Sequence, residues 1–356
     1  MNTQYILSVG SFIVSFLACF FALVPYTGYK YSLHKVPFYK SSAYLPVYTL
    51  ILIAFTVIYF ANLAKSDFLH DLNYSNIIVP LLSAGLIYAF SLTPELARFK
   101  SLIIAAAAIV SSFFLPPEFY LFEKNIPFWA DRLIIVFLWW TFGYCYVFLN
   151  KMDGILPLQN MTFGLGLTLL GFLGALPQLF MLFGLCLLAV NLAFILLNWY
   201  PAKISLSDGA ACSFGFIFGW LALAGSAEGC MPCMVILSMY YFVEVLTAYL
   251  QKFSLKDEYK NPLTNTSYYQ VNVSGLSPDV IVRHLVKLEI IFVILSIFEI
   301  YAPNAYSVPL LAFIIGAWFL SRLRNWQTPE KSLKELNREM LENIKSGLNV
   351  SGKKDD

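Results

Sequence analysis

The sequence predicts an all-α polytopic membrane protein with about eleven transmembrane helices. The 356-residue chain is 59% apolar and only 12% charged, which is far from the composition of a soluble globular domain. Its apolar stretches are long enough to cross about 30 Å of hydrocarbon. Each stretch is continuously apolar and does not alternate with polar residues, so we expect helices that satisfy their own backbone hydrogen bonds.

The candidate spans follow one another with short connections, and the fourth, sixth and eighth are short. They lie at residues 4–26, 44–63, 75–93, 101–116, 132–149, 160–176, 178–198, 210–226, 231–250, 286–302 and 305–321. No heptad pattern, low-complexity tract or internal repeat divides the chain, so residues 1–325 are predicted to form a single transmembrane domain.

Basic residues predict the orientation. With eleven spans, the connections after odd-numbered spans lie on the same side as the C-terminus. All but three of the 23 Lys and Arg residues fall on that side, the exceptions being Lys65, Lys124 and Arg132. The positive-inside rule therefore predicts that this side is cytoplasmic and that the N-terminus lies outside. For a multi-pass protein of this kind we expect the inner (cytoplasmic) membrane.

The last segment, residues 326–356, is predicted to be a cytoplasmic amphipathic helix with a frayed tail. Thr328 is a suitable N-cap, and Pro329 fits the first helical position. Apolar residues then recur at helical spacing, at Leu333, Leu336, Met340 and Ile344.

Two carboxylates in the predicted cytoplasmic loops need an explanation beyond topology. Asp153 in "NKMDGILPLQ" and Asp208 in "NWYPAKISLSDGAA" each follow a long apolar span by a few residues. The positive-inside rule explains a single Lys in such a loop, but it does not require these carboxylates. Mg²⁺ prefers one or two carboxylates and takes its remaining oxygens from water and phosphates. Two carboxylates among basic residues at one membrane face therefore suggest a magnesium–phosphate site.

These two loops resemble motifs of the polyprenyl-phosphate N-acetylhexosamine-1-phosphate transferases, membrane enzymes related to the phospho-MurNAc-pentapeptide transferases. "NKMDGI" is similar to the family's N-x-x-D-G-hydrophobic loop at Asn150, Asp153 and Gly154. The second loop is similar to N-x-x-P-A-K-I-F-M-G-D-A-G-S, the most specific of the motifs. It matches at Asn198, Pro201, Ala202, Lys203, Ile204 and Asp208.

Two further segments resemble the same family. "YSLHKVPFYKSS" is similar to the R-K-x-H-x-x-P-x-P segment after the first helix, with His34 and Pro37 in register. "GLIYAFSLTPELARFK" is similar to G-L-x-D-D-x-x-x-L-S-P-x-x-K and keeps Gly85, Leu86, Pro94 and Lys100. The similarity in order and spacing extends to about residue 320, and the predicted eleven-helix layout agrees with it.

The resemblance implies an activity and its participants. Such enzymes transfer a sugar-1-phosphate from a UDP-sugar to a membrane-embedded polyprenyl (undecaprenyl) phosphate, release UMP, use Mg²⁺ (or Mn²⁺) and initiate surface glycan synthesis. The partners are then the lipid phosphate, the UDP-sugar and the bilayer, with no nucleic acid, and a homodimer is left open. By the resemblance, Asp208 and Asp153 are catalytic and Asp208 is the metal ligand. The implied substrate-binding residues are Asn150, Lys100, Lys203, Asn198 and His34.

The chain also departs from the family pattern. Tyr88 and Ala89 replace the paired aspartates, Leu156 replaces the second aspartate after "DG", and Ser207 replaces a glycine. The expected histidine cluster is replaced at residues 266–269. Losing two carboxylates weakens a divalent-cation site. Three hypotheses therefore stay open: a Mg²⁺-dependent transferase, a catalytically impaired homologue that binds lipid phosphate or nucleotide sugar, and a transporter using the same cleft.

Two features lie outside these motifs. Glu244 falls inside the predicted ninth span, where an ionisable residue is a candidate for a functional or pairing role. Cys230 and Cys233 in "GCMPC" lie at the opposite side of the membrane, where a structural role is expected and a local disulfide remains open.

Overall fold

The structure is a computed structural model of the whole chain. It describes residues 2–27, 41–43, 75–116, 118–122, 125–254, 275–301 and 306–325, with single positions 47, 50, 51, 54, 266, 267, 271 and 272. His34, most of the predicted span 44–63 and the predicted C-terminal helix at 326–356 lie outside the described residues.

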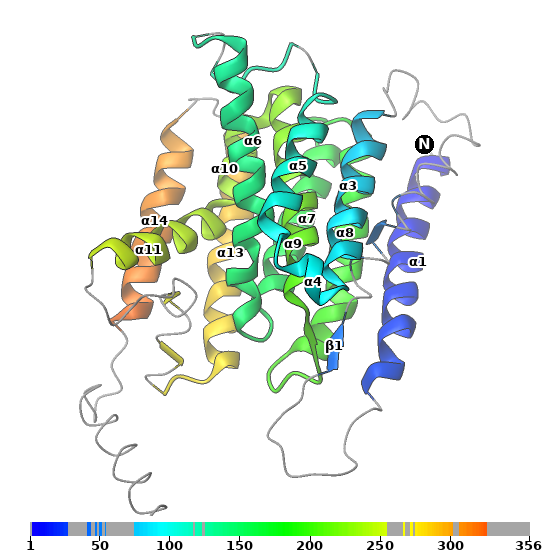
Figure 1. Cartoon of the computed structure of the whole chain (residues 1–356), viewed down its shortest axis with the longest axis vertical. Coiled ribbons are helices and arrows are strands. Elements are labelled where there is room, and N and C mark those ends of the chain that lie inside the picture. The colour runs from blue at the N-terminus through cyan, green and yellow to red at the C-terminus, as the bar shows by residue number, and fades with distance from the viewer. Residues whose placement is uncertain are drawn as a thin grey trace, which may run out of the picture.

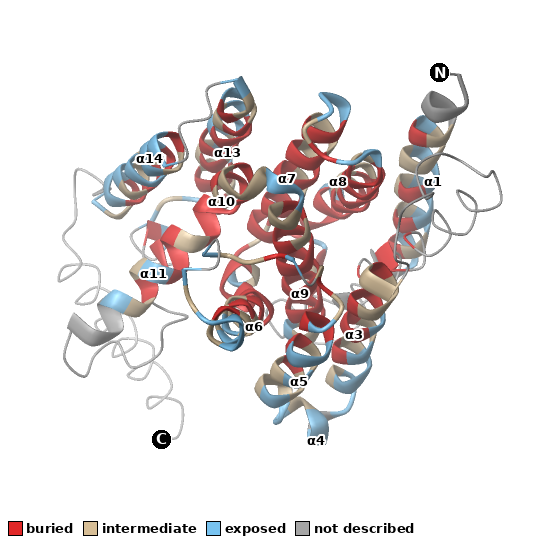
Figure 2. Cartoon of the chain, turned by 90° about the horizontal axis from the view of Figure 1, so that it is seen from above, coloured by how far each residue is buried: buried red, intermediate tan, exposed pale blue. Residues whose placement is uncertain are grey.

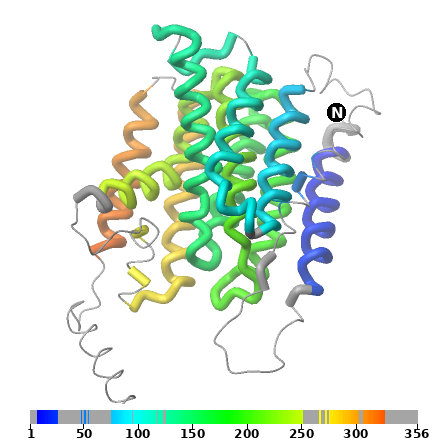
Figure 3. Tube along the Cα trace, viewed as in Figure 1, coloured from blue at the N-terminus to red at the C-terminus, as the bar shows by residue number. Residues whose placement is uncertain are grey.

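The described chain is a helical bundle in which successive helices from α3 to α9, apart from the short α4, run in alternate directions (Figures 1 and 3). Its elements are α1 (Asn2–Thr27), β1 (Ser41–Ala43), α3 (Ser75–Ser91), α4 (Pro94–Ala97), α5 (Lys100–Ser112), α6 (Phe128–Cys145), η2 (Tyr146–Lys151), α7 (Ile155–Phe172), α8 (Gln178–Asn198), β2 (Ile204–Leu206), α9 (Asp208–Gly225), η3 (Ser226–Cys230), α10 (Met231–Leu237), α11 (Met239–Ser254), α13 (Pro278–Tyr301) and α14 (Ser307–Arg324). The ends of α3, α6 and α8 and the starts of α5, α7 and α9 lie toward the lower end of the bundle in Figure 1, here called the loop end.

The predicted helical fold is confirmed, and the apolar helices support the predicted membrane class. Six helical segments in the described part of the chain are long and apolar enough to cross a membrane: Leu7–Pro25, Phe128–Lys151, Ile155–Phe172, Gln178–Asn198, Asp208–Leu237 and Ser307–Arg324. Three shorter apolar helices accompany them, at Ser75–Ser91, Lys100–Ser112 and Met239–Leu250. The outer helices α1 and α14 are exposed along one side (Figure 2). Their exposed residues include large apolar ones, such as Phe21 on α1 and Trp318 on α14, which suits contact with lipid tails.

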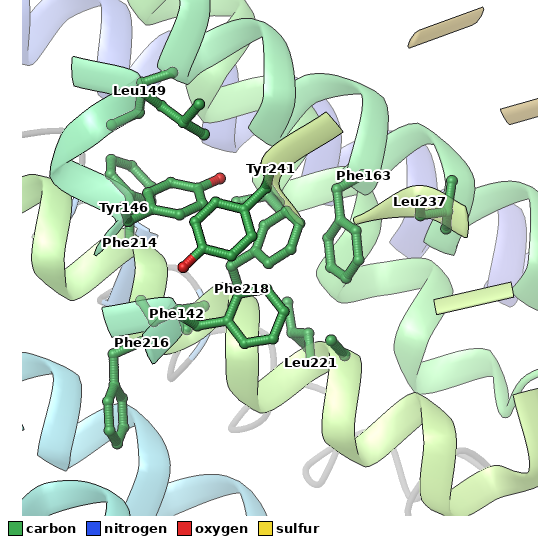
Figure 4. Packing of buried hydrophobic residues seen from close by; sticks show 14 of the residues in the cluster. Phe142, Tyr146, Leu149, Phe163, Phe214, Phe216, Phe218, Leu221, Leu237 and Tyr241 are labelled. Carbon is green, nitrogen blue, oxygen red and sulfur yellow. The ribbon is translucent and has the colours of Figure 1, made fainter. Parts of the chain in front are cut away.

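The centre of the bundle is built from α7 and α9, most of whose residues are buried (Figure 2). Aromatic rings from α6, η2, α7, α9 and α11 meet there (Figure 4). The ring centroids of Phe163 and Phe218 are 3.9 Å apart, and those of Phe142 and Tyr241 are 4.9 Å apart. Aromatic pairs of this kind add stability beyond the area they bury, so this cluster holds the helices that carry the loop-end residues.

The predicted span 231–250 is not a single helix. Helix α10 ends at Leu237 and α11 begins at Met239, while Ser238 between them has φ −94° and ψ 1°. After this break α11 crosses the side of the bundle and packs against α14 (Figure 1). The residues on either side of Ser238 include no Pro or Gly, so nothing in the local sequence signals a break. The continuous apolar run therefore predicts one straight helix, whereas packing against other helices bends the chain here.

Helix α7 starts five residues earlier than the predicted span 160–176. Pro157 falls in its first turn, where a missing N–H costs nothing. Gln159 and Asn160 are polar but fully buried, because Gln159 donates to the Leu237 carbonyl at 3.1 Å and Asn160 donates to Asn191 Oδ1 at 3.0 Å. The sequence predicts a loop that ends at Gln159 and a span that begins at Asn160, so the buried hydrogen bond of Gln159 accompanies the part of the helix that was not predicted.

Candidate functional site

A two-stranded parallel ribbon organises the loop end. Strand β1 pairs with β2 in the register Ser41 to Ile204, Ser42 to Ser205 and Ala43 to Leu206. Strand β2 lies in the second motif loop, directly before Asp208. The ribbon therefore fixes that loop against the end of the first predicted cytoplasmic loop, which contains β1.

Asn198 connects the two motif loops. It is the last residue of α8 and is almost completely buried. Its Oδ1 accepts a hydrogen bond from the Gly154 backbone N–H at 2.8 Å, and its Nδ2 donates to the Ile204 carbonyl at 2.7 Å. Both ends of the amide are used within the protein, so Asn198 positions the loops relative to each other.

The glycine of "NKMDGI" is required by the backbone. Gly154 has φ 84°, a conformation that side chains with a Cβ rarely adopt, and it directly precedes α7. A Cβ on Gly154 would also come within 3.3 Å of Val282. The turn that Gly154 permits brings its N–H to Asn198 and fixes where the preceding residues of the loop lie.

Asn150 and Asp153 both hold the second loop. Asn150 Nδ2 donates to the Leu206 carbonyl at 2.9 Å, and Asp153 Oδ2 accepts from the Ala202 N–H at 3.1 Å. Each bond joins the 146–154 segment to a residue some fifty positions later in the chain. These contacts explain why an amide and a carboxylate interrupt an apolar stretch at this place: they fasten two loops together.

Asp208 begins helix α9. Ser207 is its N-cap, and the Ser207 hydroxyl accepts a hydrogen bond from the Ala210 N–H at 3.2 Å. Serine is a preferred N-cap residue, so the replacement of the family's glycine by Ser207 is compatible with the helix start. A carboxylate in the first turn is also stabilised by the positive end of the helix dipole.

Lys151 and Asp208 form an ion pair across the two loops. Lys151 Nζ lies 3.0 Å and 3.1 Å from the two carboxylate oxygens of Asp208. The side chains are 28% and 46% exposed, so the pair lies at the surface of the loop end. Lys151 was not predicted as a site residue. The one signal in the sequence is its positive charge inside the "NKMDG" loop.

A cavity of about 290 Å³ opens beside this ion pair. It lies between the end of α3, the start of α5 and the start of α9, and two of its lining side chains are Lys100 and Asp208. Other lining residues are Ile87, Phe90, Ser91, Leu96, Ala97, Ile103, Ser207, Gly209 and Cys212. Apart from the two charges and the serines, its wall is apolar.

Two close contacts shape the cavity. Gly209 packs against α3 so tightly that a Cβ there would lie 2.1 Å from both Cβ and Oγ of Ser91. Lys100, the first residue of α5, has its ammonium 5.8 Å from the centre of the Tyr144 ring. This cation–π contact keeps the ammonium near the cavity without neutralising it.

The structure brings together some of the sequence-predicted residues and not others. Lys100 and Asp208 line the cavity, and Asn150, Asp153 and Asn198 hold its loops. Lys203 is exposed and does not line the cavity, although its N–H closes the loop by donating to Leu197 O at 2.9 Å. His34 is not described.

The positions that depart from the family pattern also lie near this end. Tyr88 and Ala89 belong to the last turn of α3, between the cavity-lining residues Ile87 and Phe90. Ser267 is fully buried at a position where the family's histidine cluster is expected.

Glu244 is placed away from the cavity. It is fully buried, and its Oε1 accepts a hydrogen bond from the Ser267 N–H. Arg324 Nε donates to Ser267 Oγ at 2.6 Å. Glu244 therefore fastens the fifth predicted loop to α11, and Arg324 fastens it to α14.

The donor set does not fit a preformed Mg²⁺ site. Asp208 carries the one carboxylate among the described residues that line the cavity, and both of its oxygens are held by Lys151. Asp153 is engaged with the Ala202 N–H. The described part of the chain contains no group of three or more His, Cys, Asp or Glu side chains that could hold a metal ion. A metal at Asp208 would require Lys151 to leave, and metal binding stays a prediction from the resemblance.

The site is thus a small, mostly apolar cavity at the loop end, with Lys100 inside it and a Lys151–Asp208 ion pair at its edge. Comparison with known proteins adds no family to this description, because no protein-family model and no curated protein matches the chain.

Proposed function

We propose that the protein transfers a HexNAc-1-phosphate from a UDP-sugar to polyprenyl phosphate at the cytoplasmic face of the inner membrane. The observation that supports it most is the shared cavity of Lys100 and Asp208, whose loops are fastened together by Asn150, Asp153 and Asn198. These residues come from three separate motifs of the resemblance. A cavity with an ammonium and apolar walls suits a phosphate attached to a hydrocarbon chain.

In this reaction an oxygen of the lipid phosphate attacks the phosphorus bonded to the sugar, and the bond from that phosphorus to the UMP oxygen breaks. A phosphate monoester has its second pKa near 6, so at neutral pH the attacking oxygen needs no base. Two anionic phosphates must approach each other, and positive charge must offset their repulsion. Lys100 is placed to supply that charge inside the cavity.

The topology is part of the proposal. Eleven spans, an outside N-terminus and a cytoplasmic C-terminus would place the loop end and its Lys100 in the cytoplasm, where UDP-sugars occur. The single substitutions Lys151→Cys and Glu118→Cys, at opposite ends of the bundle, test it. A membrane-impermeant thiol reagent applied to intact cells should label the Glu118→Cys variant above the wild-type background and leave the Lys151→Cys variant at that background. The reverse pattern would contradict the orientation.

The test of function is UMP release by the purified protein with polyprenyl phosphate and a panel of UDP-HexNAc donors. Runs with Mg²⁺, with Mn²⁺ and with a chelator test the expected cofactor. Asp208→Asn should abolish release, while Asp279→Asn is the matched control, because Asp279 pairs with Arg283 on the surface of α13 and does not line the cavity. UMP release that does not depend on polyprenyl phosphate, or that persists in the Asp208→Asn variant, would count against the proposal.

A second candidate is a homologue that binds a lipid phosphate or nucleotide sugar without turnover. The Lys151–Asp208 ion pair favours this second candidate, because Lys151 binds the carboxylate that the resemblance assigns to a metal. Tyr88 and Ala89, in place of paired aspartates, favour it too. Ligand binding by folded protein with no UMP release under any metal condition would select this candidate.

A further inference from the structure

Asp208 already has a cation at its carboxylate. Lys151 Nζ is within 3.1 Å of both oxygens, and the loop that carries it is fastened on either side. Asn150 next to it donates to Leu206 O, and Gly154 donates to Asn198. A group tethered in this way has a high effective concentration at its partner, so it competes well against a free ion.

A Mg²⁺ ion and this ammonium would compete for the same oxygens. Mg²⁺ binds carboxylate oxygens at about 2.0–2.1 Å, which would place it close to the Lys151 ammonium, and like charges at that separation repel strongly. The two arrangements therefore exclude each other. With Lys151 in place, the negative charge of Asp208 is neutralised without a metal.

Among the described residues, the remaining charge of the cavity is that of Lys100. Two ammonium groups and one carboxylate leave one net positive charge around a space of about 290 Å³. That volume is at the lower limit of ligand pockets, which span about 300–1,000 Å³, so it suits a phosphate and its first apolar group rather than a whole nucleotide sugar. Ile87, Phe90 and Ile103 supply the apolar wall.

We propose that Lys151 replaces a divalent cation in this protein: it neutralises Asp208, so that a phosphate monoester on a hydrocarbon chain binds beside Lys100 without metal. This inference rests on the proposed function for the class of ligand. Without Lys151, the free carboxylate of Asp208 would repel the phosphate, and binding would then need a metal ion.

The experiment is calorimetric titration of the purified full-length protein in detergent with farnesyl monophosphate, in a chelator and again in Mg²⁺. Inorganic phosphate and farnesol are titrated in parallel, and both should bind more weakly than the lipid phosphate. The wild type should bind farnesyl phosphate with the same affinity in both buffers.

Three variants sharpen the result. Lys151→Met should weaken binding about tenfold or more in chelator, the loss expected for an uncompensated charge near a phosphate, and Mg²⁺ should restore it. Lys151→Met with Asp208→Asn should recover binding in chelator, because the repelling carboxylate is gone. Arg98→Met is the matched control, since it removes one exposed positive charge at the same end without touching the cavity; its affinity should be unchanged.

A direct metal readout accompanies the titration. Electron paramagnetic resonance should detect little bound Mn²⁺ in the wild type and more in Lys151→Met, because that variant frees the Asp208 carboxylate. Lys151→Arg keeps the charge and should behave as the wild type in both measurements.

The proposal is overturned if the folded wild type binds farnesyl phosphate only with Mg²⁺, or does not bind it. It is also overturned if Lys151→Met binds normally in chelator. Failure of the proposed function has a different signature: no UMP release from any donor, with the metal-independent binding and its loss in Lys151→Met intact.

Discussion

Lys151 and Asp208 are 57 residues apart in the chain, yet the Lys151 ammonium lies 3.0 Å and 3.1 Å from the two carboxylate oxygens of Asp208. The pair joins the loop before α7 to the start of α9. It lies at the edge of a cavity that also contains Lys100, so it sets both the charge of the cavity and the relation between two loops.

The Lys151–Asp208 pair should contribute little to stability. Both side chains are partly exposed, and exposed ion pairs are worth about 0.2–1 kcal/mol. Lys151→Met and Asp208→Asn should therefore each lower the free energy of unfolding by less than about 1 kcal/mol. Thermal unfolding in detergent, followed by tryptophan fluorescence, measures the change. A much larger loss would mean that the pair is needed for folding, and its ligand-binding effects would need reinterpretation.

Asn198→Ala should be far more costly. It leaves the Gly154 N–H and the Ile204 carbonyl without partners in a buried place, which should cost about 2 kcal/mol or more. Asn150→Ala is the matched comparison, because it removes a single described bond to Leu206 O and should cost about 1 kcal/mol. The same unfolding measurement ranks the two variants. If Asn198→Ala and Asn150→Ala lower the free energy of unfolding equally, Asn198 does not hold the two loops together.

Gly209→Ala should disturb the cavity. Its new Cβ would overlap Ser91, forcing α3 away from α9 at a cost of about 1–3 kcal/mol. Adding Ser91→Gly removes the two overlapping atoms and should restore both stability and ligand binding. Gly10→Ala on α1, where a Cβ meets nothing within 4 Å, is the control and should be neutral or slightly stabilising. If the double variant is no better than Gly209→Ala, the contact with Ser91 is not the cause.

Glu244→Ala should loosen the fifth predicted loop without abolishing the fold. The Ser267 N–H loses its acceptor, so the connection between α11 and α13 should be cut faster by protease. Arg324→Met removes the hydrogen bond to Ser267 Oγ and should act in the same direction. The rate of cleavage between residues 255 and 277 is the readout, with Glu118→Ala at the other end of the bundle as control. An unchanged rate in both variants would contradict the anchoring role.

Much of the fold could be predicted because it depends on composition and periodicity. Long apolar runs specify helices almost regardless of context, and the helical membrane class follows from them. Polar residues beside such runs can mislead: Gln159 was predicted to end a loop, but its buried hydrogen bond to Leu237 O allows α7 to include it. The break at Ser238 has no local signal either, because it depends on what α11 packs against.

The site was predictable only to the extent that motif spacing places Asn150, Asp153, Asn198 and Asp208 near one another. Three of them hold backbone groups of neighbouring loops, an arrangement that the residue types permit but do not determine. The partner of Asp208 could not be predicted, because Lys151 reaches it across a long separation in the chain. Side-chain reach between loops depends on the backbone turn at Gly154.

The parallel pairing of β1 with β2 has a consequence for dividing the chain. A first fragment ending after residue 68, in the connection that follows the predicted span 44–63, would carry α1 and Ser41–Ala43, whose partners, α8 and Ile204–Leu206, belong to the remainder. Each fragment would then present an incomplete surface that only the other can cover. Two fragments produced from separate genes in one cell should reassemble and co-purify, so that the molecule can be built from two chains as well as from one.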